Sequence, residues 1–157
     1  MTKFVLDSSA LLSGIDIIHQ QKFEFFVTNS VLEEVRAKEP NKVLEHLKLK
    51  VTESNTEYRE IVLKKVQEMG ELKRLSKVDI EVLAVALELK AVIITDDYSI
   101  QNVAWALNIE YMPLAQRGIV ERVIWKYRCR GCGKYFSSEL STSCPICGSV
   151  LRTVREK

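Results

Sequence analysis

The sequence predicts an α/β protein in which a doubly wound parallel sheet is followed by a small C-terminal module built around cysteines. Two observations point to this fold class. Short apolar segments rich in β-branched and aromatic residues alternate with segments of helical periodicity up to residue 112. Helical patterning then stops within residues 113–118, and all four cysteines follow. We therefore predict one domain over residues 1–113, a linker over residues 114–124 and a small module over residues 125–157.

Short strands are expected throughout the first domain. The clearest are residues 3–7 (KFVLD), residues 23–27 (FEFFV) and residues 91–95 (AVIIT). The last is a β-branched run typical of a strand buried in a parallel sheet. Residues 49–52 and residues 110–112 predict two further short strands, the second of which closes the sheet.

Helices are expected between these strands. One begins within residues 8–12, and residues 28–30 (TNS) offer caps for the next. Residues 55–69 carry helical periodicity and end at Gly70, residues 76–90 form the most apolar helix, and residues 100–107 form the last. The buried sides are expected at Val31, Leu32 and Val35, then Ile61, Val62, Val66 and Met69, and then Ile80, Leu83, Ala84 and Leu87.

The composition excludes a disordered or membrane-spanning chain. Apolar residues make up 46% and charged residues 28%, which is typical of a compact soluble protein. The longest apolar run is Val82–Leu87, far below the ~20 residues of a spanning helix. The N-terminus shows no signal-peptide pattern, so we expect a cytoplasmic protein.

The charges are divided unequally along the chain. Residues 1–116 hold 14 Lys and Arg against 18 Asp and Glu, a net −4, whereas residues 117–157 hold 9 against 3, a net +6. Basic and aromatic residues are interleaved in the second part, a composition that suits nucleic acid, although a solvated basic face is the alternative. The candidate RNA-binding residues are Arg128, Arg130 and Lys134.

The four cysteines, Cys129, Cys132, Cys144 and Cys147, have the spacing C-x2-C-x11-C-x2-C. Paired C-x2-C motifs supply the four sulfurs of a tetrahedral Zn²⁺ site. Disulfides or redox pairs are the alternatives, but they are disfavoured without a secretory signal. Because every ligand would come from the protein, we expect one structural zinc per chain and no chemistry at it.

Five acids are expected near the carboxyl edge of the sheet: Asp7, Glu34, Asp79, Asp96 and Asp97. In open α/β sheets this edge is where ligands bind, and converging carboxylates suit Mg²⁺ or Mn²⁺. Each acid taken alone has a simpler explanation, since Asp7, Asp79 and Asp97 could cap helices and Glu34 could be a surface residue. His19 and His46 belong to no motif.

Together these acids resemble the pattern of PIN-domain nucleases. The matching motifs are VLDSS with Asp7, V-x-x-E-V with Glu34, S-x-x-D with Asp79, and T-x-D with Asp97. The resemblance covers residues 3–112 and implies metal-dependent cleavage of RNA. The T-x-D alignment favours Asp97 over Asp96 as a ligand, and Ser9 and Thr95 are expected to orient the carboxylates by hydrogen bonds.

Adding the cysteine module, residues 97–104 (DYSIQNVA) and residues 127–136 (YRCRGCGKYF) extends the likeness over nearly the whole chain. The combination resembles the Nin-one-binding (Nob) family of small-subunit rRNA maturation endonucleases, in a short archaeal form. This resemblance implies cleavage of precursor rRNA at its 3′ end, on a pre-ribosomal small subunit and beside a KH-domain assembly factor. A toxin-like PIN ribonuclease acting on other RNA and a non-catalytic RNA-binding assembly factor are the alternatives.

Overall fold

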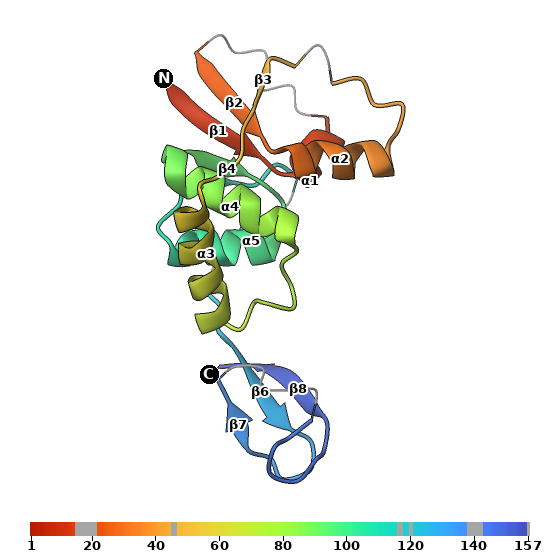
Figure 1. Ribbon diagram of the computed structural model, residues 1–157, viewed down its shortest axis with the longest axis vertical. Helices are drawn as coiled ribbons and strands as arrows, with labels where there is room; N and C mark the ends of the chain where they lie inside the picture. Colours follow the sequence, from red (N-terminus) through yellow and green to blue (C-terminus); the bar gives the residue numbers. More distant parts are fainter. Residues whose placement is uncertain (15–21, 45–46, 116–117, 120, 138–142, 157) are drawn as a thin grey trace.

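The computed structural model describes residues 1–14, 22–44, 47–115, 118–119, 121–137 and 143–156. His19 and His46, expected to take no part in a site, lie outside these ranges. Figure 1 shows the strands of the α/β domain at one end of the molecule, the helices α3, α4 and α5 in the middle, and a small antiparallel sheet at the other end. Both predicted parts of the chain are therefore present as separate sheets.

The first sheet is parallel and doubly wound, as predicted. Its strands are β1 (Thr2–Leu6), β2 (Phe23–Val27), β3 (Leu49–Val51), β4 (Val92–Ile94) and β5 (Tyr111–Met112). They lie in the order β3-β2-β1-β4-β5, and every pairing is parallel. Strands β2 and β3 thus lie on one side of β1, and strands β4 and β5 lie on the other side.

The helices are α1 (Ser8–Leu12), α2 (Asn29–Lys38), α3 (Thr56–Glu68), α4 (Lys77–Leu89) and α5 (Tyr98–Ala106). Helix α5 starts two residues before the predicted position because the Asp97 side chain caps it. Helix α4 packs against β1 and β4 as well as α3 and α5, which explains its apolar composition. In α3 the buried residues are Val62 and Val66, whereas Ile61, expected on the buried face, is 42% exposed.

The C-terminal module, called the ribbon here, is a small antiparallel sheet. Its strands are β6 (Trp125–Cys129), β7 (Tyr135–Phe136) and β8 (Leu151–Arg155), in the order β7-β6-β8. Tyr127, Cys129 and Cys144 are its buried residues within the described ranges. So small a core cannot stabilise a module of this size alone, which agrees with a requirement for metal.

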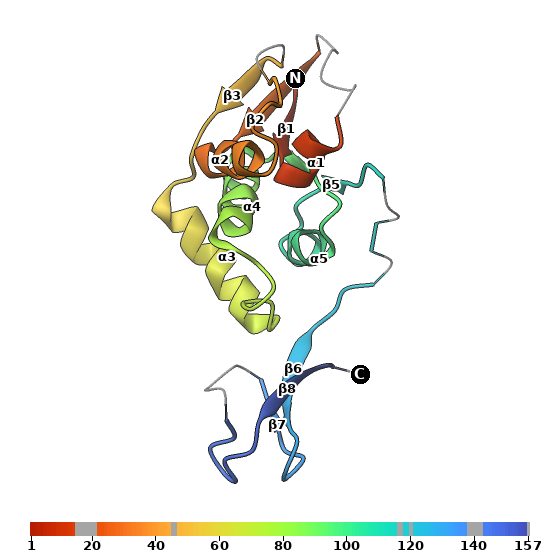
Figure 2. The same cartoon turned by 90° about the vertical axis from the view of Figure 1, so that its right-hand side faces the viewer.

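Two buried amides of α5 hold residues Ile119 and Val123, which lie between the two sheets in sequence. Gln101 donates from Nε2 to the carbonyl of Thr95 at 3.0 Å, and its Oε1 accepts from the N–H of Ile119 at 3.1 Å. Asn102 bonds the backbone of Val123 in both directions, each at 2.7 Å. Because these amides satisfy backbone groups of Ile119 and Val123, those two residues are held beside α5, the helix that lies between the parallel sheet and the ribbon in Figure 2.

The start of the ribbon is anchored on the loop between α3 and α4. The backbone N–H of Trp125 donates to the carbonyl of Met69 at 2.8 Å, and its indole Nε1 donates to Glu71 Oε1 at 3.0 Å. Gly70, with φ +69°, permits this contact, because a Cβ there would lie 2.2 Å from the Trp125 carbonyl oxygen. We conclude that the ribbon has a specific docking position on the α/β domain.

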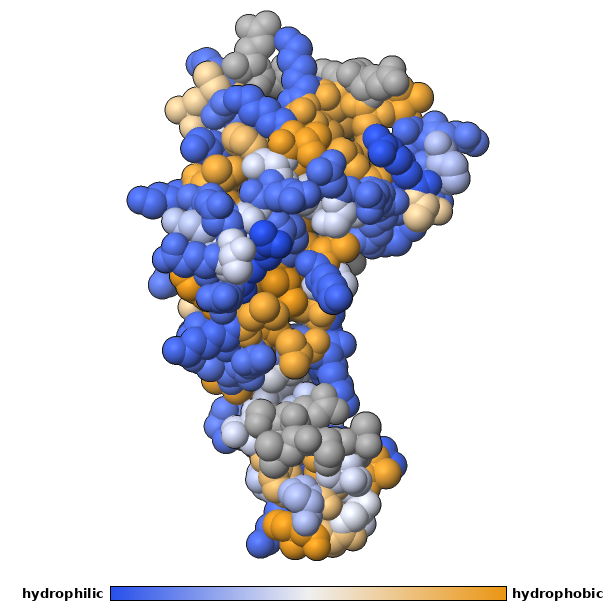
Figure 3. All heavy atoms as spheres, in the orientation of Figure 1, coloured by the Kyte–Doolittle hydropathy of each residue, from blue (hydrophilic) through white to orange (hydrophobic). Residues whose placement is uncertain are grey.

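No helix in the described part of the chain is long and apolar enough to cross a membrane. On the face drawn in Figure 3, hydrophilic side chains are interspersed with smaller hydrophobic areas over the α/β domain. Apolar atoms ordinarily make up a large part of a folded protein's surface.

Candidate active site and metal centre

The candidate active site lies where the strand order reverses. Strands β1 and β4 are neighbours in the centre of the sheet, and acidic residues follow each of them. Asp7 comes directly after β1, and Asp96 and Asp97 come after Thr95, the residue that follows β4. Because the strands are parallel, these residues emerge at the same edge. This is the position at which doubly wound proteins bind their ligands.

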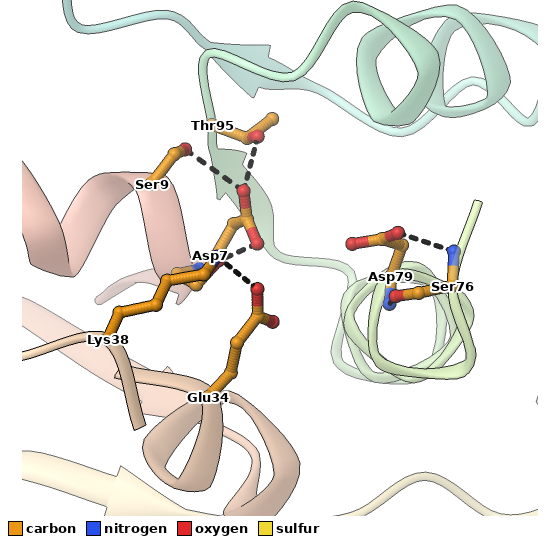
Figure 4. A network of polar contacts seen from close by, with 8 residues as sticks. Asp7, Ser9, Glu34, Lys38, Ser76, Asp79 and Thr95 are labelled. Carbon is orange, nitrogen blue, oxygen red and sulfur yellow. Dashed lines mark hydrogen bonds and ion pairs between the residues drawn. The ribbon is translucent and has the colours of Figure 1, made fainter. Parts of the chain in front are cut away.

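Asp7 is the most buried of the candidate acids, with 3% exposure. Its Oδ1 accepts from the backbone N–H of Ser8 at 2.6 Å, which caps α1. Its Oδ2 accepts from the hydroxyls of Ser9 and Thr95, each at 2.9 Å (Figure 4). The hydrogen bonds predicted from these two hydroxyls to a carboxylate are therefore present at Asp7.

Two further acids reach this edge from helices. Glu34 comes from α2, where it forms an ion pair with Lys38 one turn later. Asp79 comes from the first turn of α4, where it accepts from the backbone N–H of Ser76 at 2.6 Å in a capping box. Figure 4 shows the carboxylates of Asp7, Glu34 and Asp79 facing a common space.

The electrostatics of this space favour a cation. Burial, together with repulsion from Asp7 and Asp97, raises the pKa of Asp79, although hydrogen bonds with Ser76 oppose the shift. The hydrogen bond to Glu34 raises the pKa of Lys38, and the charges of Asp7 and Asp79 add to it. The ammonium group of Lys38 therefore lies among the carboxylates, where a metal cation could bind. The sequence analysis did not single out Lys38, although its spacing from Glu34 is that of a helical ion pair.

The two acids after β4 have different partners. Asp97 caps α5, with Oδ1 accepting from the N–H groups of Ser99 and Ile100 at 2.7 and 3.1 Å. Asp96 accepts at 2.8 to 3.2 Å from the N–H groups of Leu114 and Ala115, at the start of the linker. The charge of Asp97 also contributes to the raised pKa of Asp79, so Asp97 lies near enough to act on the acids at the sheet edge.

The carboxylates stand farther apart than the sulfurs of the ribbon. Within the described ranges, only the four cysteines bring three or more ligand atoms within 4.8 Å of one another. Mg²⁺ keeps several of its waters and is held directly by only one or two carboxylates, so a wider group of acids still suits it. The donor set at the sheet edge consists of oxygens alone, which fits Mg²⁺ or Mn²⁺.

The four cysteines of the ribbon form a compact sulfur cluster. Cys129 and Cys147 place their Sγ atoms 3.3 Å apart, and Cys132 and Cys144 place theirs 3.8 Å apart. Four sulfurs at ~2.3 Å from one Zn²⁺ would be separated by about 3.8 Å, so the cluster fits zinc. All four are free thiols rather than disulfides. Hydrogen bonds from the side chain and backbone of Ser149 lower the pKa of Cys147 to about 6, which favours the thiolate that a metal requires.

The basic residues expected to bind RNA lie around this cluster. Arg130 and Lys134 are exposed, and Arg128 is half-buried with its guanidinium 5.5 Å from the Tyr135 ring. The register also pairs Arg128 directly with Arg152 on β8, a residue that the sequence analysis did not single out. Like charges directly opposite on two strands repel each other, so this pair adds to the positive charge concentrated on the ribbon.

Comparison with known proteins agrees with this geometry. Residues 4–89 match the family model described as the PIN domain of ribonuclease. The chain is 40% identical to "Endoribonuclease Nob1" of Pyrococcus abyssi, covering 97% of this chain and 93% of that protein. It is also 40% identical to "Endoribonuclease Nob1" of Methanocaldococcus jannaschii, covering 94% of this chain and 75% of that protein.

A solved structure of VapBC2 from Rickettsia felis bound to a DNA fragment from its promoter shows the same fold. Its TM-score is 0.50 at 13% identity, over 71% of this chain and 98% of that chain, and this likeness supports the fold alone. The match to the family model and the likeness to the two archaeal proteins over nearly the whole chain show the family as well as the fold. The chain belongs to the Nob1 family of PIN-domain endoribonucleases.

Proposed function

We propose that this endoribonuclease processes precursor small-subunit rRNA at its 3′ end during ribosome biogenesis. The observation that supports the proposal is the gathering of oxygen ligands from Asp7, Glu34 and Asp79 at one sheet edge. The second support is that this chain is similar, over nearly its whole length, to two archaeal proteins named Endoribonuclease Nob1. The choice of precursor rRNA rests on that likeness.

The catalytic residues in this proposal are Asp7, Glu34, Asp79 and Asp97, with Asp96 as the alternative acid after β4. They would hold one or two Mg²⁺ or Mn²⁺ ions, which lower the pKa of a bound water and stabilise charge on the attacked phosphate. Ser9 and Thr95 keep the Asp7 carboxylate in one orientation. The ion pair of Lys38 with Glu34 competes with a divalent cation for the charge of the same carboxylate.

The proposed reaction is in-line hydrolysis of a phosphodiester bond, leaving a 5′-phosphate and a 3′-hydroxyl. Carboxylates and bound cations suffice for this chemistry, so a histidine base is not required. Asp79, whose pKa is raised by burial and by its acidic neighbours, becomes fully ionised most easily when a cation is bound beside it.

The ribbon supplies the RNA-binding surface in this proposal, through Arg128, Arg130 and Lys134. The acidic part of the chain, at −4, repels a polyanion, whereas the part from residue 117 carries +6 before metal binding. One Zn²⁺ held by four thiolates would leave this part still near +4. The proposed partners are the pre-ribosomal small subunit and a KH-domain assembly factor, in the cytoplasm.

The experiment that tests the proposal is cleavage of a precursor rRNA fragment with mapping of the 5′ ends of the products. We expect one cut at the mature 3′ end of the small-subunit rRNA, dependent on Mg²⁺ or Mn²⁺. An unrelated RNA of equal length is the control. Equal cleavage of both would indicate a PIN ribonuclease acting on other RNA, and binding without cleavage at any metal concentration would indicate a non-catalytic assembly factor.

A further inference from the structure

A cavity of about 500 Å³ lies between α5 and the start of the ribbon. Its lining comes from both parts of the chain and includes Tyr98, Ser99 and Asn102 of α5, Val123 of the linker, and Trp125 and Arg155 of the ribbon. We propose that this cavity binds one unpaired nucleobase of the RNA, next to the phosphate that is cleaved. The inference rests on the proposed function, because it assumes that RNA occupies the carboxylate edge.

The cavity adjoins the candidate active site through α5. Asp97 caps this helix, and the next two residues, Tyr98 and Ser99, line the cavity. A nucleotide whose phosphate lies beside Asp97 would therefore have its base within reach of Tyr98. Single-stranded RNA can turn its bases outward in this way, because they are not held in a duplex.

The lining has the properties of a base-binding site. Tyr98 is an aromatic residue on α5 that is 50% exposed, so part of its ring is free to stack. Arg155 lies on the ribbon, with its guanidinium 5.9 Å from the Trp125 ring centroid and its side chain 60% exposed. It also forms a 3.2 Å ion pair with Glu121, another residue of the lining. Aromatic rings and arginine planes are the groups on which proteins stack unpaired bases, and the volume falls in the range of ordinary ligand pockets. The net positive charge of the ribbon beside the cavity favours a polyanion such as RNA over a basic peptide.

The two sides of the cavity are held together by a buried polar cluster. Glu71 is 1% exposed, and its Oε1 accepts from Asn102 Nδ2 at 2.7 Å and from Trp125 Nε1 at 3.0 Å. The guanidinium of Arg74 stacks on the Trp125 ring at 3.7 Å. Because these contacts join α5, the α3–α4 loop and β6, the cavity has fixed walls and need not form on binding.

The test uses the full chain carrying Asp7→Asn, so that RNA binds without being cut, and a single-stranded RNA with the fluorescent base 2-aminopurine placed at successive positions around the cleaved phosphate. We expect strong quenching at one position adjacent to that phosphate, through stacking on Tyr98. Tyr98→Ala should abolish this quenching and weaken RNA binding about tenfold, whereas Tyr98→Phe should retain both.

Trp105→Ala is the matched control. Trp105 is also on α5 and 42% exposed, but it does not line this cavity. We expect it to leave quenching and affinity unchanged. Equal behaviour of Tyr98→Ala and Trp105→Ala, or no position-specific quenching in the parent protein, would overturn the proposal. Failure of the proposed function can be told apart from failure of this proposal. If only the proposed function is wrong, the wild-type protein shows no cleavage specific to rRNA, but quenching that depends on Tyr98 is still observed.

Discussion

The two metal sites of this chain are built in opposite ways. The cysteines come from two C-x2-C motifs within residues 129–147, whereas the acids at the sheet edge are spread from Asp7 to Asp97 and meet only because β1 and β4 are neighbours. The zinc site, made from motifs close in sequence, organises the fold of the ribbon around it. The carboxylate site, made from residues distant in sequence, depends on the folded α/β domain, so replacing one of its acids can abolish activity without unfolding the protein.

The largest expected effect comes from the acids. Asp7→Asn and Asp97→Asn should each reduce cleavage by about 100-fold or more, because each removes a charged metal ligand while conserving shape. RNA binding and the melting temperature should change little. Turnover is measured on the precursor rRNA fragment at saturating RNA.

Asp96→Asn is the matched control for this experiment. Its side chain can still accept from the N–H groups of Leu114 and Ala115, so we expect near-normal turnover. Wild-type turnover by both the Asp7 and the Asp97 variants would contradict the assignment. Loss of turnover in Asp96→Asn alone would instead make Asp96 the ligand.

Removal of zinc should have a large but local effect. Structural zinc contributes on the order of 10 kcal/mol to the folding of small modules. The ribbon should therefore unfold from about residue 125 when the zinc is removed. The α/β domain should stay folded because its core is assembled from its own helices and strands. Elemental analysis should find one zinc per chain, and amide NMR spectra should show loss of ribbon signals only. A disulfide among the four cysteines, or simultaneous unfolding of both parts, would contradict this expectation.

Replacing Arg128, Arg130 and Lys134 together with Ala should weaken RNA binding but leave cleavage at saturating RNA nearly unchanged. Each lost phosphate contact lowers the dependence of log K on log salt by ~0.7 for single strands, so the slope should fall by about two units. The measurement is RNA affinity across a salt series. An unchanged affinity and slope would mean that the ribbon docks on protein and that the α/β domain recognises RNA.

The smallest expected effect concerns Glu71 at the junction of the two parts. Burial raises the pKa of Glu71 above its ordinary value of 4.5, although hydrogen bonds from Asn102 and Trp125 oppose the shift. A carboxyl with a raised folded-state pKa stabilises most below its unfolded pKa, and this contribution is lost as pH rises through the folded pKa. Glu71→Gln should therefore become more stable relative to wild type as pH rises from about 4.5 to 7, by about 2 °C or less in Tm. Parallel Tm curves for the two proteins over this range would exclude the effect.

The sequence was sufficient for features that depend on local pattern. The strands β2 and β4 follow from short β-branched and aromatic runs, and the sulfur cluster follows from cysteine spacing. The positions of Asp7 and Asp97 at strand ends followed as well, because parallel strands share an edge.

Features that depend on packing between distant segments could not be predicted. Gln101 and Asn102 are polar residues on a helix, and they are buried where they hydrogen-bond the backbone of Ile119 and Val123, which lie 18 and 21 residues further along the chain. Ile61 was expected in the core, yet α3 buries only the narrow stripe of Val62 and Val66. Lys38 was overlooked because its contact with Glu34 matters only once Asp7 and Asp79 are nearby.

The contact of Gly70 with Trp125 has a consequence for how the position of cleavage is chosen. A flexible linker would give the ribbon a distribution of distances from the carboxylates, and RNA bound by the ribbon would be offered to them at many positions. Docking of Trp125 on the α3–α4 loop gives one distance instead. If the ribbon binds RNA as proposed, the enzyme would measure a fixed length of RNA from the bound site to the cut. Its specificity would then reside in spacing rather than in the sequence at the cleaved bond.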